Sequence, residues 1–169
     1  MKKISFLIYK FLKLIDSIFI KVLKRSFLLW FSDFISNDQY IKLNVAEKKT
    51  YFFTPNQTTK WRVDTLFTKE PETIEWINSF DKSKKIIFWD IGANIGLYSI
   101  YAAQKHNDIN ILSFEPSTSN LRILSRNISV NSLIHKIKIN QLPLGEKKNI
   151  NSILHEAEFI EGWSMNTFG

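Results

Sequence analysis

The stretch IIFWDIGANIGLYSIYAA, residues 86–103, decides the fold of this chain. Its apolar start predicts a buried strand that ends at Asp90, and its last seven residues predict a helix. Gly92 and Gly96 lie between the two elements. An acid at a strand end, followed by glycines that open a helix, is typical of the loop that holds a nucleotide-like cofactor in an α/β fold.

The same alternation of strand and helix continues along the chain. We expect strands at 86–90, 109–115 and 137–142, with helices at about 95–106 and 120–131. Strands that alternate with helices predict a parallel sheet with right-handed crossovers. The predicted fold class is therefore α/β, with an incomplete Rossmann-like parallel sheet of three strands and an N-terminal amphipathic helical extension.

Three segments of different character divide the chain. Residues 1–36 form a basic helical arm, 37–85 a lead-in, and 86–169 the partial Rossmann-like domain. The lead-in contains a short aromatic strand candidate at 51–53, a loose strand-like alternation at 61–67, and a helix at 71–80 with Pro in its first turn. Residues 143–169 show weak periodicity, with at most a short hairpin.

The positive charge of the chain is concentrated in the arm. Residues 1–36 hold seven basic residues and two acids, a net charge of +5 out of the total of +7. A general nucleic-acid-binding surface is therefore not expected. The chain has no Cys, and its three His are scattered, so we expect neither a disulfide nor a metal site.

The arm has a helical period with two unlike sides. Its lysines fall within a sector of about 100°, and its apolar side chains fall on the opposite side. The lysines are Lys2, Lys3, Lys10, Lys13, Lys21 and Lys24, and the apolar residues are Ile4, Ile8, Phe11, Leu12, Ile15, Ile18, Phe19 and Val22. Such a helix packs on the rest of the protein or on a second copy, which is the favoured interpretation, or lies in a membrane interface. We expect a cytoplasmic protein, peripheral to the inner face of the membrane in the second case.

Five residues near the predicted strand ends suit cofactor binding. Gly92 and Gly96 allow the backbone to approach a ligand, and Asn94 is a suitable N-cap for the following helix. Asp90 offers a carboxylate to an ammonium group or a water. Glu115 lies 25 residues later, where an acid accepts hydrogen bonds from the two hydroxyls of a ribose. Each residue alone is also explained by a turn, a cap or a strand exit, but their combination favours a cofactor site.

The glycine spacing separates two kinds of cofactor. The dinucleotide fingerprint G-x-G-x-x-G fails, because Asn94 and Leu97 occupy its second and third glycine positions. This argues against a nicotinamide-linked oxidoreductase. The observed D-x-G-x-x-x-G spacing resembles the first motif of class I S-adenosylmethionine-dependent methyltransferases. The resemblance implies that the loop holds the amino-acid end of the cofactor and that Glu115 holds its ribose.

A longer string narrows the resemblance to one family. Two stretches strongly resemble the FkbM-type methyltransferases. The first is residues 88–99, FWDIGANIGLYS, and the second is Phe114-Glu115-Pro116 followed by Asn120-Leu121, Leu124, Asn127 and Asn131. Upstream, Trp61-Arg62 and Glu70-Pro71 look like the lead-in of one subgroup. This family implies O-methylation of a saccharide or other small-molecule acceptor. It also implies that S-adenosylmethionine contacts Asp90, Gly92, Asn94, Gly96 and Glu115, with Glu70 near the same side.

The chain also departs from the family. A class I methyltransferase sheet has seven strands, and a fourth-strand motif of the form I-K-x-D-x-E-G is missing here. We therefore expect the N-terminal part of a split or truncated enzyme, and no catalytic base is assigned. The alternative function is a non-catalytic remnant or interaction module that binds a membrane surface or a partner subunit through the N-terminal helix.

Overall fold

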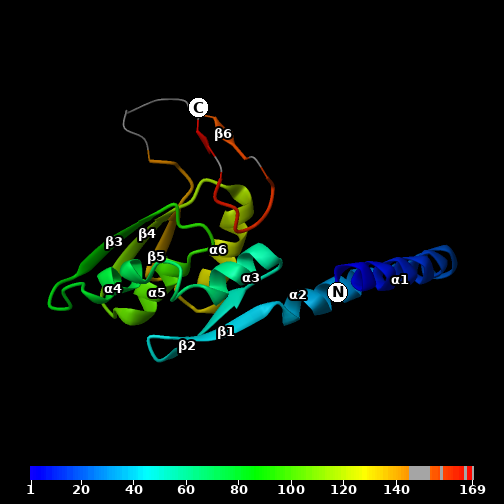
Figure 1. Ribbon diagram of the computed structural model, residues 1–169, viewed down its shortest axis with the longest axis horizontal. Helices are drawn as coiled ribbons and strands as arrows, with labels where there is room; N and C mark the ends of the chain where they lie inside the picture. Colours follow the sequence, from blue (N-terminus) through cyan, green and yellow to red (C-terminus); the bar gives the residue numbers. More distant parts are fainter. Residues whose placement is uncertain (145–152, 157, 166, 169) are drawn as a thin grey trace. The chain divides into compact units, whose positions relative to one another are not determined.

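The computed structural model describes residues 1–144, 153–156, 158–165 and 167–168 (Figure 1). The chain divides into two compact units, Met1–Gln39 and Tyr40–Gly169. The first unit contains α1 (Lys2–Leu23) and α2 (Leu28–Asp38). The second contains, in chain order, β1 (Tyr40–Val45), β2 (Lys48–Phe53), α3 (Gln57–Asp64), α4 (Pro71–Asn78), β3 (Ile86–Ile91), α5 (Leu97–Lys105), β4 (Ile109–Phe114), α6 (Thr118–Val130), β5 (Ile137–Asn140), β6 (Leu154–His155) and β7 (Thr167–Phe168).

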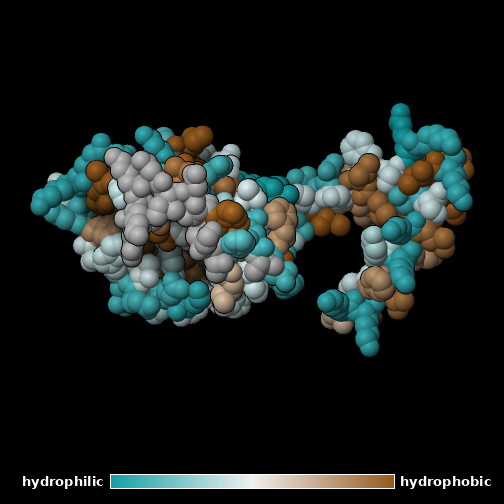
Figure 2. All heavy atoms as spheres, turned by 90° about the horizontal axis from the view of Figure 1, so that it is seen from above, coloured by the Kyte–Doolittle hydropathy of each residue, from teal (hydrophilic) through white to brown (hydrophobic). Residues whose placement is uncertain are grey.

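The N-terminal unit is a pair of helices rather than one continuous helix. No Gly or Pro marks the break, but Lys24 adopts a left-handed conformation, with φ of 55°. The carboxylate of Asp16 then accepts hydrogen bonds from Phe27 N and Ser26 Oγ, both at 2.8 Å. A side chain of α1 thus satisfies backbone donors at the start of α2. Figure 2 shows apolar side chains, in brown, on the outside of this unit.

The second unit is built around a parallel sheet with the strand order β3-β4-β5. This confirms the expected α/β fold class with a Rossmann-like parallel sheet. Because the strand order follows the chain and parallel crossovers are right-handed, α5 and α6 lie on one face of the sheet. Phe88 and Asp90 point to that face and are buried. Ile87, Trp89 and Ile91 point the other way and are 68%, 55% and 64% exposed.

The antiparallel hairpin of β1 and β2 packs against α6. Asn127 of α6 and Asn131, the C-cap of α6, pair with the backbone of β2 as a neighbouring strand would. Asn127 Oδ1 accepts from Phe53 N at 2.7 Å, and its Nδ2 donates to Ile95 O at 2.9 Å. Asn131 accepts from Tyr51 N at 2.8 Å and donates to Tyr51 O at 2.7 Å. The hairpin is thereby joined both to α6 and to the loop that follows β3.

The strand-like interpretation of residues 61–67 is wrong, because α3 occupies most of this segment. A capping box starts the helix: Asn56 Oδ1 accepts from Thr59 N at 2.8 Å, and Asn56 N donates to Thr59 Oγ1 at 3.3 Å. Val63, one helical turn beyond Thr59, enters the core. Near the C-terminus, where at most a short hairpin was expected, β6 and β7 form an antiparallel pair of two residues each.

Candidate functional site

The loop after β3, residues 92–96, carries three residues in the left-handed region. The φ angles are 76° at Gly92, 51° at Asn94 and 85° at Gly96. The backbone N–H groups of Gly92 and Ala93 both donate to Phe114 O at 2.9 Å. The loop is therefore held against the end of β4, at the edge of the sheet where parallel α/β folds bind ligands.

The two glycines of the loop have different surroundings. A Cβ at Gly96 would lie 2.4 Å from Leu124 Cδ1, so this glycine allows the loop to pack against α6. A Cβ at Gly92 would meet no atom within 4 Å. Gly92 therefore faces open space, whereas Gly96 serves the packing of the scaffold.

The expectation that Asn94 is the N-cap of the following helix is wrong. The helix α5 begins at Leu97, and its N-cap is Gly96. Asn94 lies two residues before this N-cap and has a positive φ of its own. Asn94 Oδ1 accepts from Ile95 N at 3.0 Å, and Nδ2 donates to Trp163 O at 2.9 Å.

Glu115 connects the loops that follow β3 and β4. Its Oε2 accepts from Asn94 N at 2.7 Å, and its Oε1 accepts from Ser117 N at 2.9 Å and from Asn120 Nδ2 at 3.4 Å. The side chain is buried, with 5% of the residue exposed. A carboxylate offers about four acceptor positions, so acceptor capacity remains for a ligand.

Two cavities of about 220 Å³ each lie on this side of the sheet. Gly92, Asn94 and Ser164 line both of them. The first is polar and charged, and its lining includes Arg62, Lys69, Glu70 and Tyr98. The second is more apolar, and its lining includes Ile91, Phe114, Glu115, Pro143, Leu144 and Trp163. The glycine loop thus borders two compartments of different chemistry.

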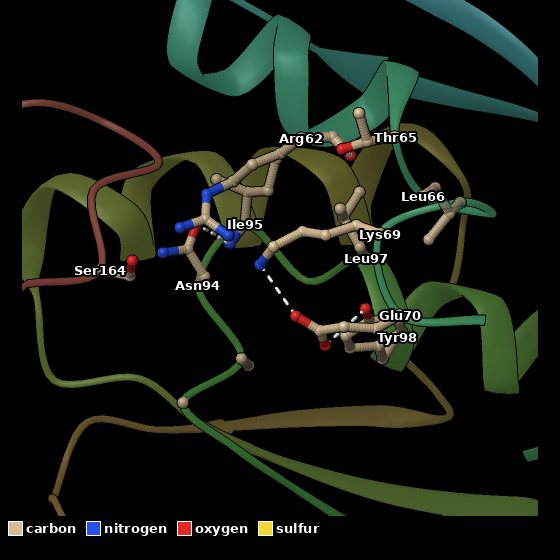
Figure 3. A pocket seen from close by; sticks show the side chains of 12 residues that line it. Arg62, Thr65, Leu66, Lys69, Glu70, Asn94, Ile95, Leu97, Tyr98 and Ser164 are labelled. Atoms are coloured by element: carbon tan, nitrogen blue, oxygen red, sulfur yellow. Dashed lines mark hydrogen bonds and ion pairs between the residues drawn. The ribbon is translucent and has the colours of Figure 1, made fainter. Parts of the chain in front are cut away.

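Charged groups of both signs meet in the first cavity (Figure 3). Lys69 Nζ and Tyr98 Oη each donate to Glu70 at 2.8 Å, and these hydrogen bonds hold the pKa of Glu70 below its ordinary value. Burial and the neighbouring Glu70 raise the pKa of Tyr98. Burial lowers the pKa of Arg62, whose guanidinium points into the same space as the Lys69 ammonium. The cavity therefore offers cations and a carboxylate at close range.

Residues 161–164, here called the C-terminal strap, form one wall of the site. Trp163 O accepts from the side chains of Asn94 and Asn120, at 2.9 and 3.0 Å. Gly162 N donates to Asn120 Oδ1 at 2.8 Å, and Gly162 O accepts from Arg62 Nε. Glu161 forms an ion pair with Arg122 of α6. Elements distant in sequence thus hold the strap beside both cavities.

Asp90 lies behind the loop and lines neither cavity. Its carboxylate accepts from the backbone N–H of Ser99 at 3.0 Å and from the Ser99 hydroxyl, which also bonds Ser113 at 2.6 Å. Burial raises the pKa of Asp90. Asp90 therefore anchors the first turn of α5, and its contact with a cofactor stays a prediction.

The structure brings together some of the predicted site residues. Gly92, Asn94 and Glu115 line a cavity, whereas Asp90 and Gly96 support the loop from behind. The sequence alone assigned no role to Arg62, Lys69, Tyr98, Asn120 or the strap. The only signal for part of this group was the resemblance around Trp61-Arg62, Glu70-Pro71 and Asn120.

No protein-family model matches this chain. The chain is 42% identical over 55 residues to the Methyltransferase sdnD of Sordaria araneosa, a match that covers 32% of this chain and 21% of that relative. The chain thus spans about a fifth of the relative's length.

Several solved methyltransferase structures align with part of this chain. StiE O-MT is 14% identical, with 53% of this chain and 31% of that chain covered and a TM-score of 0.41. An O-methyltransferase family protein from Burkholderia thailandensis is 8% identical, with 50% and 25% covered and a TM-score of 0.40. The N-terminal domain of human METTL16 in complex with SAH is 16% identical, with 70% and 58% covered and a TM-score of 0.39.

Proposed function

We propose that residues 40–169 bind S-adenosylmethionine and serve an O-methyltransferase of the FkbM type, whose acceptor is a hydroxyl of a saccharide or another small molecule. One observation carries this proposal: two cavities of unlike chemistry meet at Gly92 and Asn94. A zwitterionic amino-acid group joined to a nucleoside needs a charged compartment beside a more apolar one. The sequence similarity to sdnD supports the methyltransferase part of this proposal.

The first cavity suits the amino-acid end of this cofactor. The guanidinium of Arg62 and the ammonium of Lys69 would bind its carboxylate, since charge-assisted hydrogen bonds are the stronger ones. The carboxylate of Glu70 would accept from its ammonium group. Glu70 stays ionised for this task because Lys69 and Tyr98 lower its pKa. Gly92 leaves room for the ligand to approach the backbone.

The second cavity suits the nucleoside. Glu115 already accepts three hydrogen bonds, from Asn94 N, Ser117 N and Asn120 Nδ2, which leaves about one acceptor position for a ribose hydroxyl. Apolar side chains beside it, among them Ile91, Phe114 and Leu144, would flank the base. Asp90 and Gly96 would contribute indirectly, because they fix the loop between the two compartments.

The bound cofactor would supply a sulfonium methyl group for in-line attack by an acceptor oxygen. The contribution of this chain is orientation: charged groups fix one end of the cofactor, Glu115 fixes the other, and the strap limits access of water. Correct positioning accounts for a large share of the acceleration in two-substrate reactions. We assign no catalytic base.

Isothermal titration of the full chain with S-adenosylhomocysteine tests the proposal. We expect saturable binding by the wild type, and its loss in Glu115→Ala. Glu75→Ala, which removes an exposed acid of α4, is the matched control and should bind as the wild type does. A folded, monodisperse sample that does not bind would overturn the proposal. Binding of NAD instead would favour an oxidoreductase.

A second candidate function is an interaction module without catalysis. The observation that favours it is the large exposed apolar surface of the N-terminal unit, which lies outside the candidate site. This candidate predicts that removal of residues 1–36 abolishes partner or membrane binding, and that the cofactor titration shows no heat.

A further inference from the structure

The exposed charge of α1 is entirely positive. Its lysines are exposed, and they occupy one side of the helix. Asp16 is the only acid of α1, and it is 5% exposed. Its carboxylate is occupied by hydrogen bonds from Ser26 and Phe27. The capping of α2 therefore removes the single negative charge from the surface of α1.

The opposite side of α1 is apolar and only partly covered by α2. The rings of Phe19 and Phe27, the N-cap of α2, pack at 5.3 Å, so the start of α2 covers part of this face. The remainder stays exposed, with 54% of Ile8, 62% of Phe11 and 72% of Val22 accessible. The apolar face runs along the helix from Ile4 near its start through Ile18 to Val22 near its end.

We propose that α1 lies flat in the interface of a membrane that carries anionic lipid. Its apolar face would enter the acyl region, and its lysines would contact the lipid headgroups. A helix of 22 residues is about 33 Å long, which suits this position. Among the helices that the structure describes, none combines the length and the apolar character needed to cross a bilayer.

Charge complementarity favours an anionic lipid surface over a second copy of this chain. A second copy seated on the apolar face would bring two segments 1–36 together, each with a net charge of +5. Like charges repel one another, so this pairing is disfavoured. An anionic bilayer instead offers negative headgroups to the lysine side of α1 while its apolar face is buried. The proposal is independent of the cofactor site.

Co-sedimentation of the full chain with lipid vesicles tests the proposal. We expect binding to vesicles of phosphatidylcholine with phosphatidylglycerol, weaker binding to phosphatidylcholine alone, and release by added salt. Replacement of Lys3, Lys10 and Lys21 by Gln should weaken the binding about a hundredfold, since each charge near an anionic surface contributes about fivefold. Replacement of Lys82, Lys84 and Lys85 by Gln removes the same charge from an exposed turn of the second unit and should change nothing.

Three results would overturn the proposal. The first is equal binding of the wild type to neutral and anionic vesicles. The second is an equal loss of vesicle binding in the two triple variants. The third is a wild-type chain that sediments as a dimer and binds no vesicles. Gln keeps the helix propensity of Lys, so the variants should retain the helix content of the wild type. The double variant Ile8→Ser, Ile18→Ser separates the apolar contribution, and it should lose binding even at low salt.

Discussion

Glu115 accepts a hydrogen bond from the backbone N–H of Asn94 at 2.7 Å, and this contact joins the ends of β3 and β4. The acid expected to hold a ribose is therefore also a structural part of the glycine loop. Its second oxygen orders the start of α6 through Ser117 N. A substitution at this position changes both the ligand site and the loop, and experiments have to separate the two effects.

Glu115→Gln should weaken the binding of S-adenosylhomocysteine at least tenfold and lower the free energy of unfolding by about 2 kcal/mol, because hydrogen bonds to a charged acceptor are lost. The amide NH₂ would also face the donors of Ser117 and Asn120. Calorimetric titration and urea unfolding measure the two effects. Glu75→Gln is the control. A loss of stability with unchanged affinity would show that Glu115 is an anchor only.

The two loop glycines should respond differently to alanine. Gly96→Ala should cost about 2 to 4 kcal/mol, because a Cβ meets buried Leu124 and φ is positive. Gly92→Ala should cost only the conformational strain of about 1 to 2 kcal/mol. Its larger effect should be on ligand affinity, since the new methyl group enters the shared lining of the cavities. Equal unfolding free energies of the two variants would contradict this.

Asp90 should make stability depend on pH in a defined direction. Burial raises its pKa in the folded state, so the folded protein keeps a proton that the unfolded chain loses above about pH 4. The wild type therefore loses stability as pH rises from the unfolded pKa to the folded pKa, by about 1.4 kcal/mol for each pH unit between these two values. Asp90→Asn lacks this loss. The free energy of unfolding of Asp90→Asn minus that of the wild type should therefore rise with pH. It should level off above the folded pKa of Asp90.

Urea unfolding at a series of pH values measures this difference. Asp108→Asn, at an exposed position before β4, is the control. Parallel stability curves for wild type and Asp90→Asn would contradict the prediction.

Asn127 and Asn131 offer a matched pair, because both bond the backbone of β2 but differ in burial. Asn127→Ala leaves the buried Phe53 N–H and Ile95 C=O without their partner and should cost about 2 to 5 kcal/mol. Asn131→Ala should cost about 1 kcal/mol or less, because water reaches the Tyr51 groups. Urea unfolding compares them, and the reverse order would refute the role given to Asn127.

Arg62 should distinguish ligands with and without an amino-acid end. Arg62→Gln should bind S-adenosylhomocysteine about tenfold to a hundredfold more weakly, through the loss of a charged hydrogen bond. Binding of 5′-methylthioadenosine, which lacks the amino acid, should not change. Arg122→Gln loosens the strap at Glu161 without touching the first cavity, and it is the control. Equal weakening for both ligands would mean that Arg62 acts only through the strap.

The sheet elements could be predicted from the sequence because their signals are local. The apolar run before Asp90 and the glycines after it place β3 and α5 to within two residues. α3 was missed because only Thr59 and Val63 are buried in it, and the capping box at Asn56 was the available signal. The strap could not be predicted, since its contacts come from Arg62, Asn94 and Asn120, far away in the chain.

The exposed face of β3 has a thermodynamic consequence. Ile87, Trp89 and Ile91 form an apolar row on a strand that, among the described residues, has a strand neighbour on one side only. Any surface that covers this row binds the folded state and not the unfolded one, so it raises the unfolding midpoint by mass action. Where such a surface is supplied, the melting temperature of the second unit should rise with the concentration of that surface.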